Sequence, residues 1–218
     1  MPLIFFDYDG VQADSLAVES KYFVAACQKV GIRGIDCPDD LARLSEGNFY
    51  EECAKGGISK ADIDKALELY GQKLDDLEYH IEPFPLIMRL EAEVADRFPT
   101  YIITSNTSAT VAEMLERQQV TGVREILGAD VEVSKVKKID RVRVQYPGEK
   151  MYFIGDTKGD ILEARAAGVD VTIGVTWGWH APEVVASAQP DYIFHDQPAF
   201  CAFMRGLMDG AGKSPSTR

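Results

Sequence analysis

Short apolar runs alternate with helical patterns through the C-terminal part of the chain. Each run is rich in β-branched and aromatic residues, and the clearest are TYIITS at 100–105, KMYFIGD at 150–156, VTIGVTW at 171–177 and DYIF at 191–194. The segments between them carry apolar residues at helical spacing. Strands that are apolar along their whole length and separated by helices indicate a parallel sheet covered on both faces. The pattern therefore predicts an α/β fold with a doubly wound parallel sheet.

One further strand, predicted over 3–8, is separated from the others by a segment that shows helical patterns alone. Since a lone strand needs the sheet as its partner, this segment is predicted to be an inserted all-helical domain over 15–81. The core domain would then comprise 1–14 and 82–210, with a flexible polar tail at 211–218. Linkers are expected near 12–15 and 81–85, the second stiffened by its prolines.

Composition and charge exclude several classes of function. With 218 residues, 46% of them apolar, the chain can bury a sizeable core. The net charge of −12 repels phosphate backbones, so nucleic acid is not an expected partner. No apolar stretch reaches the ~18 residues of a membrane span. The four cysteines fit no zinc pattern and indicate reduced thiols in a cytoplasmic protein, which we expect to be a monomer or a homodimer.

Polar residues with catalytic potential follow the predicted strands directly. In a parallel sheet, ligands bind beyond the carboxyl ends of the strands, so these residues should share one edge. Carboxylates gathered there need a cation, and ligation by oxygen alone favours Mg²⁺ over zinc. The residues at this edge, with the lysine that opens a following helix, are Asp7, Asp9, Ser105, Asn106, Lys135, Asp156 and Asp160.

Each of these features also has a purely structural explanation. Asp156 could start a helix as its N-cap, and Ser105 or Asn106 could cap another. Lys135 could be an ordinary solvated lysine. Their joint occurrence at the strand ends of one sheet is harder to explain by structure alone.

Four segments together resemble the haloacid dehalogenase superfamily of hydrolases. FFDYDGVQADS resembles its first motif, YIITSN the second, SKVKKI the third and FIGDTKGDI the fourth, in the same order and spacing. The helical insertion after the first motif resembles the cap of the phosphoglycolate-phosphatase type. The resemblance covers nearly the whole chain and implies a Rossmann-like core with that cap.

The resemblance also implies roles for the carboxylates. Asp7 would be the nucleophile that forms an aspartyl-phosphate. Mg²⁺ would be held by the side chains of Asp7 and Asp156 and by the backbone carbonyl of Asp9. The Asp9 side chain would protonate the leaving group and later activate water. Asp160 would lie in the outer sphere, holding a metal-bound water or orienting Lys135.

The phosphate-binding groups are implied in the same way, with two alternatives open. Ser105 and the backbone N–H of Asn106 would hold the phosphoryl oxygens, close to Gly10. Lys135 would balance the charge. The second motif can also be aligned on Thr104. The third lacks the common Lys-Pro form, so Lys138 competes with Lys135.

The function implied is Mg²⁺-dependent hydrolysis of a small, phosphoglycolate-like phosphomonoester. A sugar phosphomutase of the β-phosphoglucomutase kind and a catalytically silent binding protein of the same fold are the alternatives. In the cap, Asn48, Tyr50 and Lys55 are candidate substrate contacts. We expect Trp177 and Trp179 to pack at the rim and His180 to be solvated. Gln12 stands where the family usually has an apolar residue.

Overall fold

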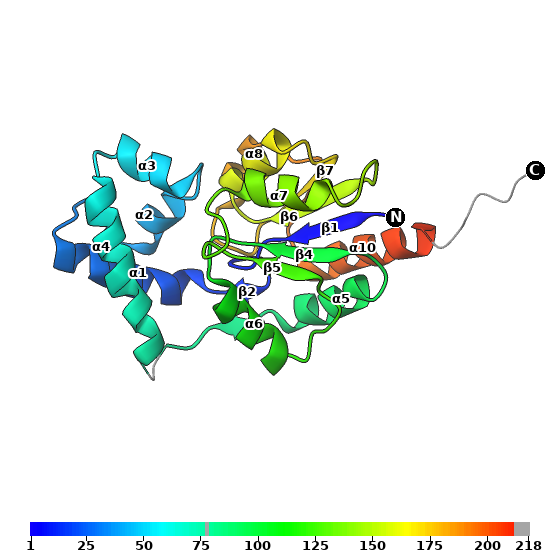
Figure 1. The fold of residues 1–218 in the computed structure, drawn as a ribbon, viewed down its shortest axis with the longest axis horizontal. Coiled ribbons are helices and arrows are strands. Elements are labelled where there is room, and N and C mark those ends of the chain that lie inside the picture. The colour runs from blue at the N-terminus through cyan, green and yellow to red at the C-terminus, as the bar shows by residue number, and fades with distance from the viewer. Residues whose placement is uncertain (77–78, 212–218) are drawn as a thin grey trace, which may run out of the picture.

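A six-stranded parallel sheet forms the centre of the protein, as the computed structural model of residues 1–76 and 79–211 shows (Figure 1). Of the predicted tail at 211–218, Ala211 ends the last helix, and residues 212–218 lie outside the described residues. The strand order is β5-β4-β1-β6-β7-β8, so the chain winds outward from the central β1 in both directions. The strands are β1 (Leu3–Phe6), β4 (Thr100–Ile103), β5 (Glu125–Leu127), β6 (Met151–Gly155), β7 (Val171–Val175) and β8 (Tyr192–Phe194). The predicted fold class is confirmed.

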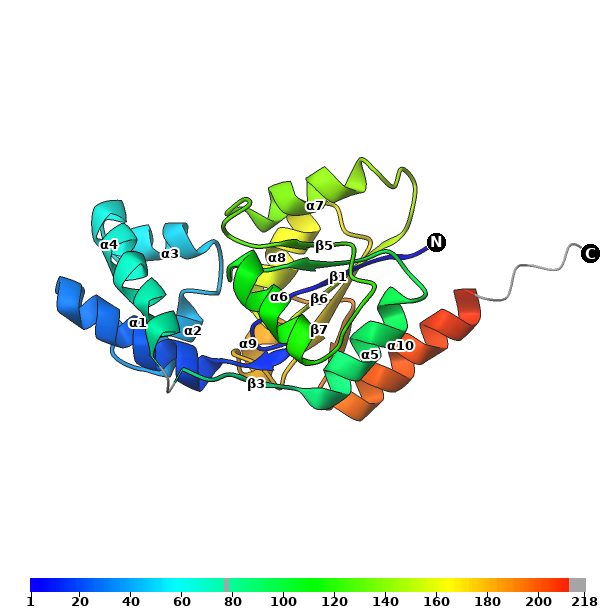
Figure 2. The ribbon, with the colours of Figure 1, turned by 60° about the horizontal axis from the view of Figure 1, so that its bottom comes forward.

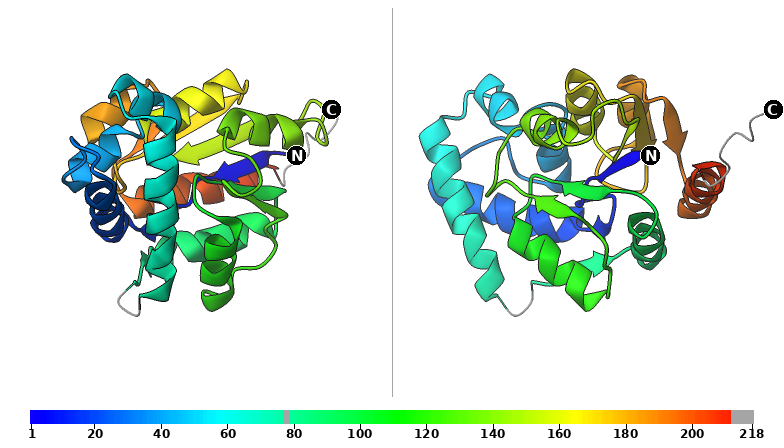
Figure 3. Two further views of the ribbon diagram at one scale, coloured as in Figure 1. Left: turned by 60° about the vertical axis from the view of Figure 1, so that its left-hand side comes forward. Right: turned by 45° about the vertical axis from the view of Figure 1, so that its right-hand side comes forward.

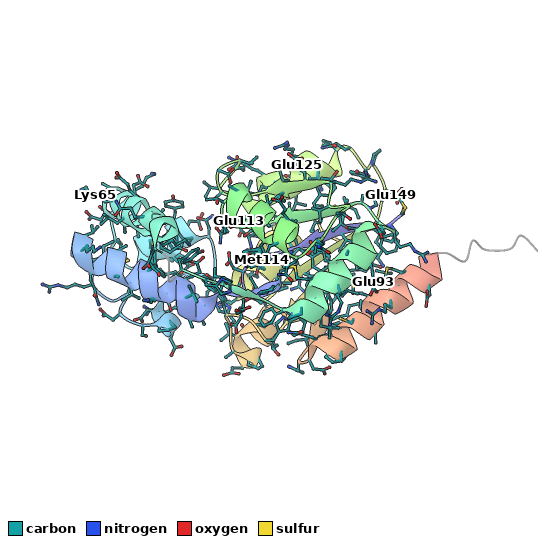
Figure 4. All side chains as sticks on the ribbon, turned by 90° about the horizontal axis from the view of Figure 1, so that it is seen from below. Lys65, Glu93, Glu113, Met114, Glu125 and Glu149 are labelled. Atoms are coloured by element: carbon teal, nitrogen blue, oxygen red, sulfur yellow. The ribbon has the colours of Figure 1, made fainter. Side chains whose placement is uncertain are left out.

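Helices cover both faces of the sheet. One face carries α5 (Pro85–Ala95), α6 (Ser108–Arg117) and α10 (Gln197–Ala211), and the other carries α7 (Lys135–Arg143) and α8 (Lys158–Ala166). The short α9 (Pro182–Ser187) packs against α8 and β7. Ion pairs reinforce the outside: Glu93 on α5 binds Arg205 on α10, and Glu125 on β5 binds Arg141 on α7 (both glutamates labelled in Figure 4).

The apolar run of β1 explains why this strand is central. Successive side chains of a strand point to opposite faces, so Leu3 and Phe5 pack under α7 and α8. Ile4 and Phe6 pack on the other face, among apolar residues of α5 and α10. All four are fully buried, which a strand achieves only when both faces are covered.

The segment between β1 and the rest of the sheet is helical and stands at one end of the core (Figures 2 and 3). It contains α1 (Leu16–Val30), α2 (Pro38–Arg43), α3 (Phe49–Lys55), α4 (Lys60–Gly71) and the 3₁₀ helix η1 (Gln72–Asp75). Asn48 and Ser59 cap α3 and α4 by accepting backbone N–H groups. A separate apolar cluster that includes Phe23, Leu41 and Ile63 holds these helices together.

The two connections to the helical segment pair with each other instead of running as plain linkers. Antiparallel β2 (Ala13–Asp14) and β3 (Glu82–Pro83) form a two-stranded ribbon. The prolines fit this arrangement because Pro83 lies at a ribbon edge and Pro85 starts α5. None of the described helices is long and apolar enough to cross a membrane.

Candidate active site

The carboxyl ends of three neighbouring strands bring the predicted site residues together. β1 lies between β4 and β6, with Phe6 opposite Ile102 on one side and Ile154 on the other. The next residues along each strand therefore meet at one edge: Asp7 after β1, Thr104 after β4 and Asp156 after β6. A hydrogen bond from the Asp7 N–H to the Ile154 carbonyl (2.9 Å) fixes the first of these.

Asp7 and Asp156 present oxygen atoms that have no partner among the described residues. Both carboxylates are buried, and Oδ1 of each lacks a hydrogen bond. With Asp160, their oxygens lie within 4.8 Å of one another. Burial and then the charge on Asp160 raise the pKa of Asp7 to about 8, against the opposing effect of Lys135. Burial likewise raises the pKa of Asp156. Such a buried, oxygen-only donor set suits Mg²⁺.

Two glycines leave the space beside these carboxylates open. A Cβ on Gly10 would lie 2.0 Å from Asp156 Oδ2, and one on Gly178 would lie 2.3 Å from the same atom. Gly10 also has φ +72°, in the left-handed region that glycine tolerates best. Gly10, a predicted phosphate contact, thus lies beside Asp156, whereas no pattern in the sequence singled out Gly178.

Lys135 rather than Lys138 contacts Asp7. Its ammonium lies 3.0 Å from Asp7 Oδ2 and also binds Asp160 Oδ1. Although burial opposes it, the charges on Asp160 and Asp7 raise the pKa of Lys135. Lys138 donates instead to the carbonyl of Thr104 (2.6 Å), and burial lowers its pKa to about 8.

Both oxygens of Asp160 are already engaged. Oδ1 binds Lys135, while Oδ2 accepts from the N–H (3.1 Å) and the hydroxyl (2.8 Å) of Thr157 at the start of α8. Asp160 therefore caps its helix and orients Lys135.

The Asp9 side chain has different neighbours from Asp7. It accepts a hydrogen bond from Asn106 Nδ2 (3.2 Å) and one from the hydroxyl of Ser15, the residue before α1. Burial, followed by the charge on Glu19, raises the pKa of Asp9 to about 6. A carboxyl group with such a pKa can exchange a proton near neutral pH.

The three residues that follow β4 differ in burial and in hydrogen bonding. Thr104 is buried, and its hydroxyl accepts the backbone N–H of Asn106 (3.0 Å). The Asn106 N–H that we expected to bind phosphate is thus already bonded in this structure. Ser105 is exposed at the same strand end, and its hydroxyl is available to a ligand.

Residues 177–180 connect the site to the helical cap. The Trp179 N–H donates to Asp156 Oδ2 (2.6 Å), and its indole N–H donates to Ser15 Oγ (3.0 Å). The expectation of a solvated His180 is wrong: only 5% of this residue is exposed. Its Nε2 donates to the Ala42 carbonyl of the cap (2.6 Å), because Nδ1 accepts the Lys158 N–H (2.9 Å).

The candidate cap residues make contacts within the cap or line a cleft at its edge. Lys55 is exposed and pairs with Glu52 (2.6 Å), and the side chain of Asn48 caps α3. Tyr50 lines an apolar cleft near Val133. The preceding loop does approach the core, since the Gly159 N–H donates to the Ser45 carbonyl (3.0 Å).

Comparison with known proteins agrees with this geometry. The profile of the family described as haloacid dehalogenase-like hydrolase matches residues 4–174. The chain belongs to this family. A phosphoglycolate phosphatase of Vibrio cholerae is 30% identical over 215 residues, covering 89% of this chain and 92% of that protein. One from Synechococcus elongatus is 25% identical over 197 residues, covering 88% and 92%. The predicted class of enzyme, a phosphatase-type hydrolase of this family, is confirmed.

Solved structures show the same fold. A haloacid dehalogenase-like hydrolase from Streptococcus pneumoniae has a TM-score of 0.74 and 28% identity, covering 92% of this chain and 97% of that chain. A hydrolase from Pseudomonas syringae has a TM-score of 0.75 and 17% identity, covering 95% and 99%. The second likeness concerns the fold alone.

Proposed function

We propose that the protein is a Mg²⁺-dependent phosphatase that hydrolyses a small phosphomonoester through an aspartyl-phosphate on Asp7. One observation carries this proposal: two buried carboxylates lie together beside a lysine, each with an oxygen that has no partner among the described residues, while a third carboxylate is held apart from them. This arrangement separates a nucleophile from a proton carrier.

The metal would be held by the side chains of Asp7 and Asp156 and by the backbone carbonyl of Asp9. Their oxygen donors and the space that Gly10 and Gly178 leave open fit such an ion. When bound, Mg²⁺ supplies the positive charge that lets a carboxylate approach a phosphate dianion.

The residues of the chain divide the reaction between them. An oxygen of Asp7 attacks phosphorus, the bond from phosphorus to the leaving oxygen breaks, and Asp9 gives its proton to that oxygen. Asp9 then takes a proton from the water that cleaves the acyl phosphate. Inorganic phosphate leaves, and both carboxylates return to their starting state.

Charge and hydrogen bonding at the phosphoryl group would come from two further residues. Lys135 lies 3.0 Å from Asp7 and can balance the charge that develops during transfer. The exposed hydroxyl of Ser105 can donate to a phosphoryl oxygen, and so can the Thr104 hydroxyl, which accepts the Asn106 N–H and keeps its own proton. The contacts therefore favour Lys135 over Lys138, while Ser105 and Thr104 both stay candidates.

Release of inorganic phosphate from a panel of phosphorylated metabolites tests the proposal. The panel includes phosphoglycolate because two relatives of the chain are named phosphoglycolate phosphatase. We expect turnover with Mg²⁺, none with chelator, and none in Asp7→Asn. Conversion of a hexose 1-phosphate to the 6-phosphate without phosphate release would favour a phosphomutase. A silent binding protein would be favoured if the folded protein turned over none of the compounds and if Mg²⁺ with beryllium fluoride did not change its unfolding temperature.

A further inference from the structure

A buried ionic cluster occupies the cap next to the site. The ammonium of Lys73 in η1 lies 2.5 Å from Glu19 Oε2, and side-chain exposure is 5% for the lysine and 1% for the glutamate. Tyr70 also donates to Glu19 Oε2, and Tyr79 donates to Oε1 (2.9 Å). Lys73 in addition lies 3.7 Å from the centre of the Tyr70 ring. The cluster joins α1, the end of α4, η1 and the return connection to the core.

Helix α1 places this cluster beside Asp9. The Glu19 N–H donates to the Ser15 carbonyl (2.8 Å), so the two residues lie one helical turn apart on the same face. The Ser15 hydroxyl in turn donates to the Asp9 carboxylate. The charges on Glu19 and Lys73 both act on Asp9, the first raising its pKa and the second lowering it. A leaving group that receives its proton from Asp9 therefore emerges next to this cluster.

The cluster carries no net positive charge for a substrate anion. Within the described part of residues 15–81, Lys73 is the single buried cation, and Glu19 already neutralises it. Lys158, which faces the cap from α8, pairs with Glu46 (3.0 Å). Lys55 pairs with Glu52 on the exposed side of α3, and Lys65 lies at the end of the cap remote from the sheet (Figure 4).

The seam between cap and core is apolar on the side of Lys135. A cleft with a volume of about 460 Å³ lies there between α3, α4 and the core loop before α7. Cys53, Ile58, Ile63 and Val133 contribute to its walls. Val133 comes two residues before Lys135, which contacts Asp7. Two charged residues also line the cleft, Glu51 and Lys60, but both are exposed and Lys60 pairs with Asp64 (2.6 Å). A carboxylate placed in this seam would lose its water without gaining a buried counter-ion.

We propose that the non-phosphate part of the substrate carries no negative charge and is at least partly apolar, such as an aryl or alkyl alcohol. The paired Glu19 and Lys73 are the residues that set this preference. The inference rests on the proposed phosphatase activity and narrows it, because it separates this chain from enzymes that act on phosphorylated carboxylic acids.

Two matched pairs of compounds test the preference on the wild-type protein. Phenyl phosphate is compared with 4-carboxyphenyl phosphate, and 2-hydroxyethyl phosphate with phosphoglycolate, by kcat/KM for phosphate release. We expect the uncharged member of each pair to be favoured at least tenfold. A carboxylated compound that equals or exceeds its uncharged partner overturns the inference and leaves the proposed activity standing. No release from any of the four contradicts the proposed activity, and the inference falls with it.

Glu19→Gln tests the residues that set the preference. The amide keeps the shape of the glutamate but leaves Lys73 without its counter-ion, so the carboxylated compounds should gain about tenfold relative to their partners, the size of one charge-assisted contact. Glu52→Gln is the matched control, because it frees Lys55 at the exposed face and should leave both ratios unchanged. Equal ratios in Glu19→Gln and wild type show that Lys73 does not meet the substrate. The wild-type comparison decides the charge preference even if Glu19→Gln does not fold.

Discussion

At the scale of single residues, two aspartates at one strand end differ in chemistry because they have different neighbours. Asp7 is buried against Lys135 and keeps an oxygen without a partner in the described part of the chain, whereas Asp9 is bonded to Asn106 and Ser15. The spacing of the two carboxylates could be recognised in the sequence, because it forms part of a known motif. The partners of Asp9 could not, since Ser15 and Asn106 reach it only through the fold.

The two lysines of the third motif should respond differently to substitution. Lys135→Met removes the ammonium that contacts Asp7 and Asp160, and we expect kcat to fall by about 10²–10³-fold, as for the loss of one charge-stabilising donor. Lys138→Met removes a hydrogen bond to the Thr104 carbonyl, and its main effect should be on stability. Steady-state kinetics and thermal unfolding of both variants check this. A larger loss of kcat in Lys138→Met than in Lys135→Met would mean that Lys138, and not Lys135, has the catalytic role.

At the scale of elements, α5 contains a buried carboxylic acid that is not part of the proposed site. Glu91 is fully buried, and neither of its oxygens has a partner among the described residues. Burial raises its pKa from 4.5 to about 8. Between these two values the folded protein holds a proton that the unfolded chain has released, so stability falls as pH rises from about 4.5 to 8.

Glu91→Met should therefore stabilise the protein, and more at pH 8 than at pH 5. We expect a gain of about 1–3 kcal/mol at pH 8, the usual penalty of an unsatisfied buried polar group. Glu93→Gln on the same helix is the control, since its exposed pair with Arg205 should contribute little. Urea unfolding at both pH values measures the difference. A gain that does not depend on pH would mean that Glu91 does not titrate as described.

The elements differed in how far the sequence predicted them. The long apolar strands were clear because both their faces are buried. Strand β5 has three residues and α5 begins directly after a proline-rich connection, and neither was assigned in advance. Each strand of the β2–β3 ribbon has two residues. They pair across segments that are about seventy positions apart in the sequence, since Ala13 lies opposite Pro83. Local patterns hold too little information for such short elements.

At the scale of the whole molecule, hydrogen bonds across the seam dock the cap on the core. Ala42 and Ser45 of the cap accept from His180 and Gly159, and Glu46 pairs with Lys158. Trp179, the residue directly before His180, donates its backbone N–H to Asp156. The position of the cap is thus linked to a carboxylate of the proposed metal site through two adjacent residues. No sequence pattern revealed this link, because the contacts of His180 depend on how the two parts meet.

His180→Ala should loosen the docked cap. We expect a loss of about 1–3 kcal/mol of stability, from a buried hydrogen bond and an unsatisfied Ala42 carbonyl, together with a raised KM. His195→Ala is the control, because His195 is exposed and contacts Thr176 on the core (3.0 Å). Thermal unfolding and kinetics measured together separate the two effects. A lower Tm with unchanged KM and kcat would limit His180 to a structural role.

The most direct test of the account is detection of a phosphoryl group on Asp7. In Asp9→Asn, an aryl phosphate with a good leaving group can still transfer its phosphoryl group, since the phenolate needs no proton. Hydrolysis of the aspartyl-phosphate should be slow because the base that activates water is missing. Acid quenching followed by mass spectrometry of peptides should then find the modification on Asp7, with Mg²⁺ present and not with chelator. Turnover of the same compound by Asp7→Asn, or a phosphoryl group on another residue, would contradict the account.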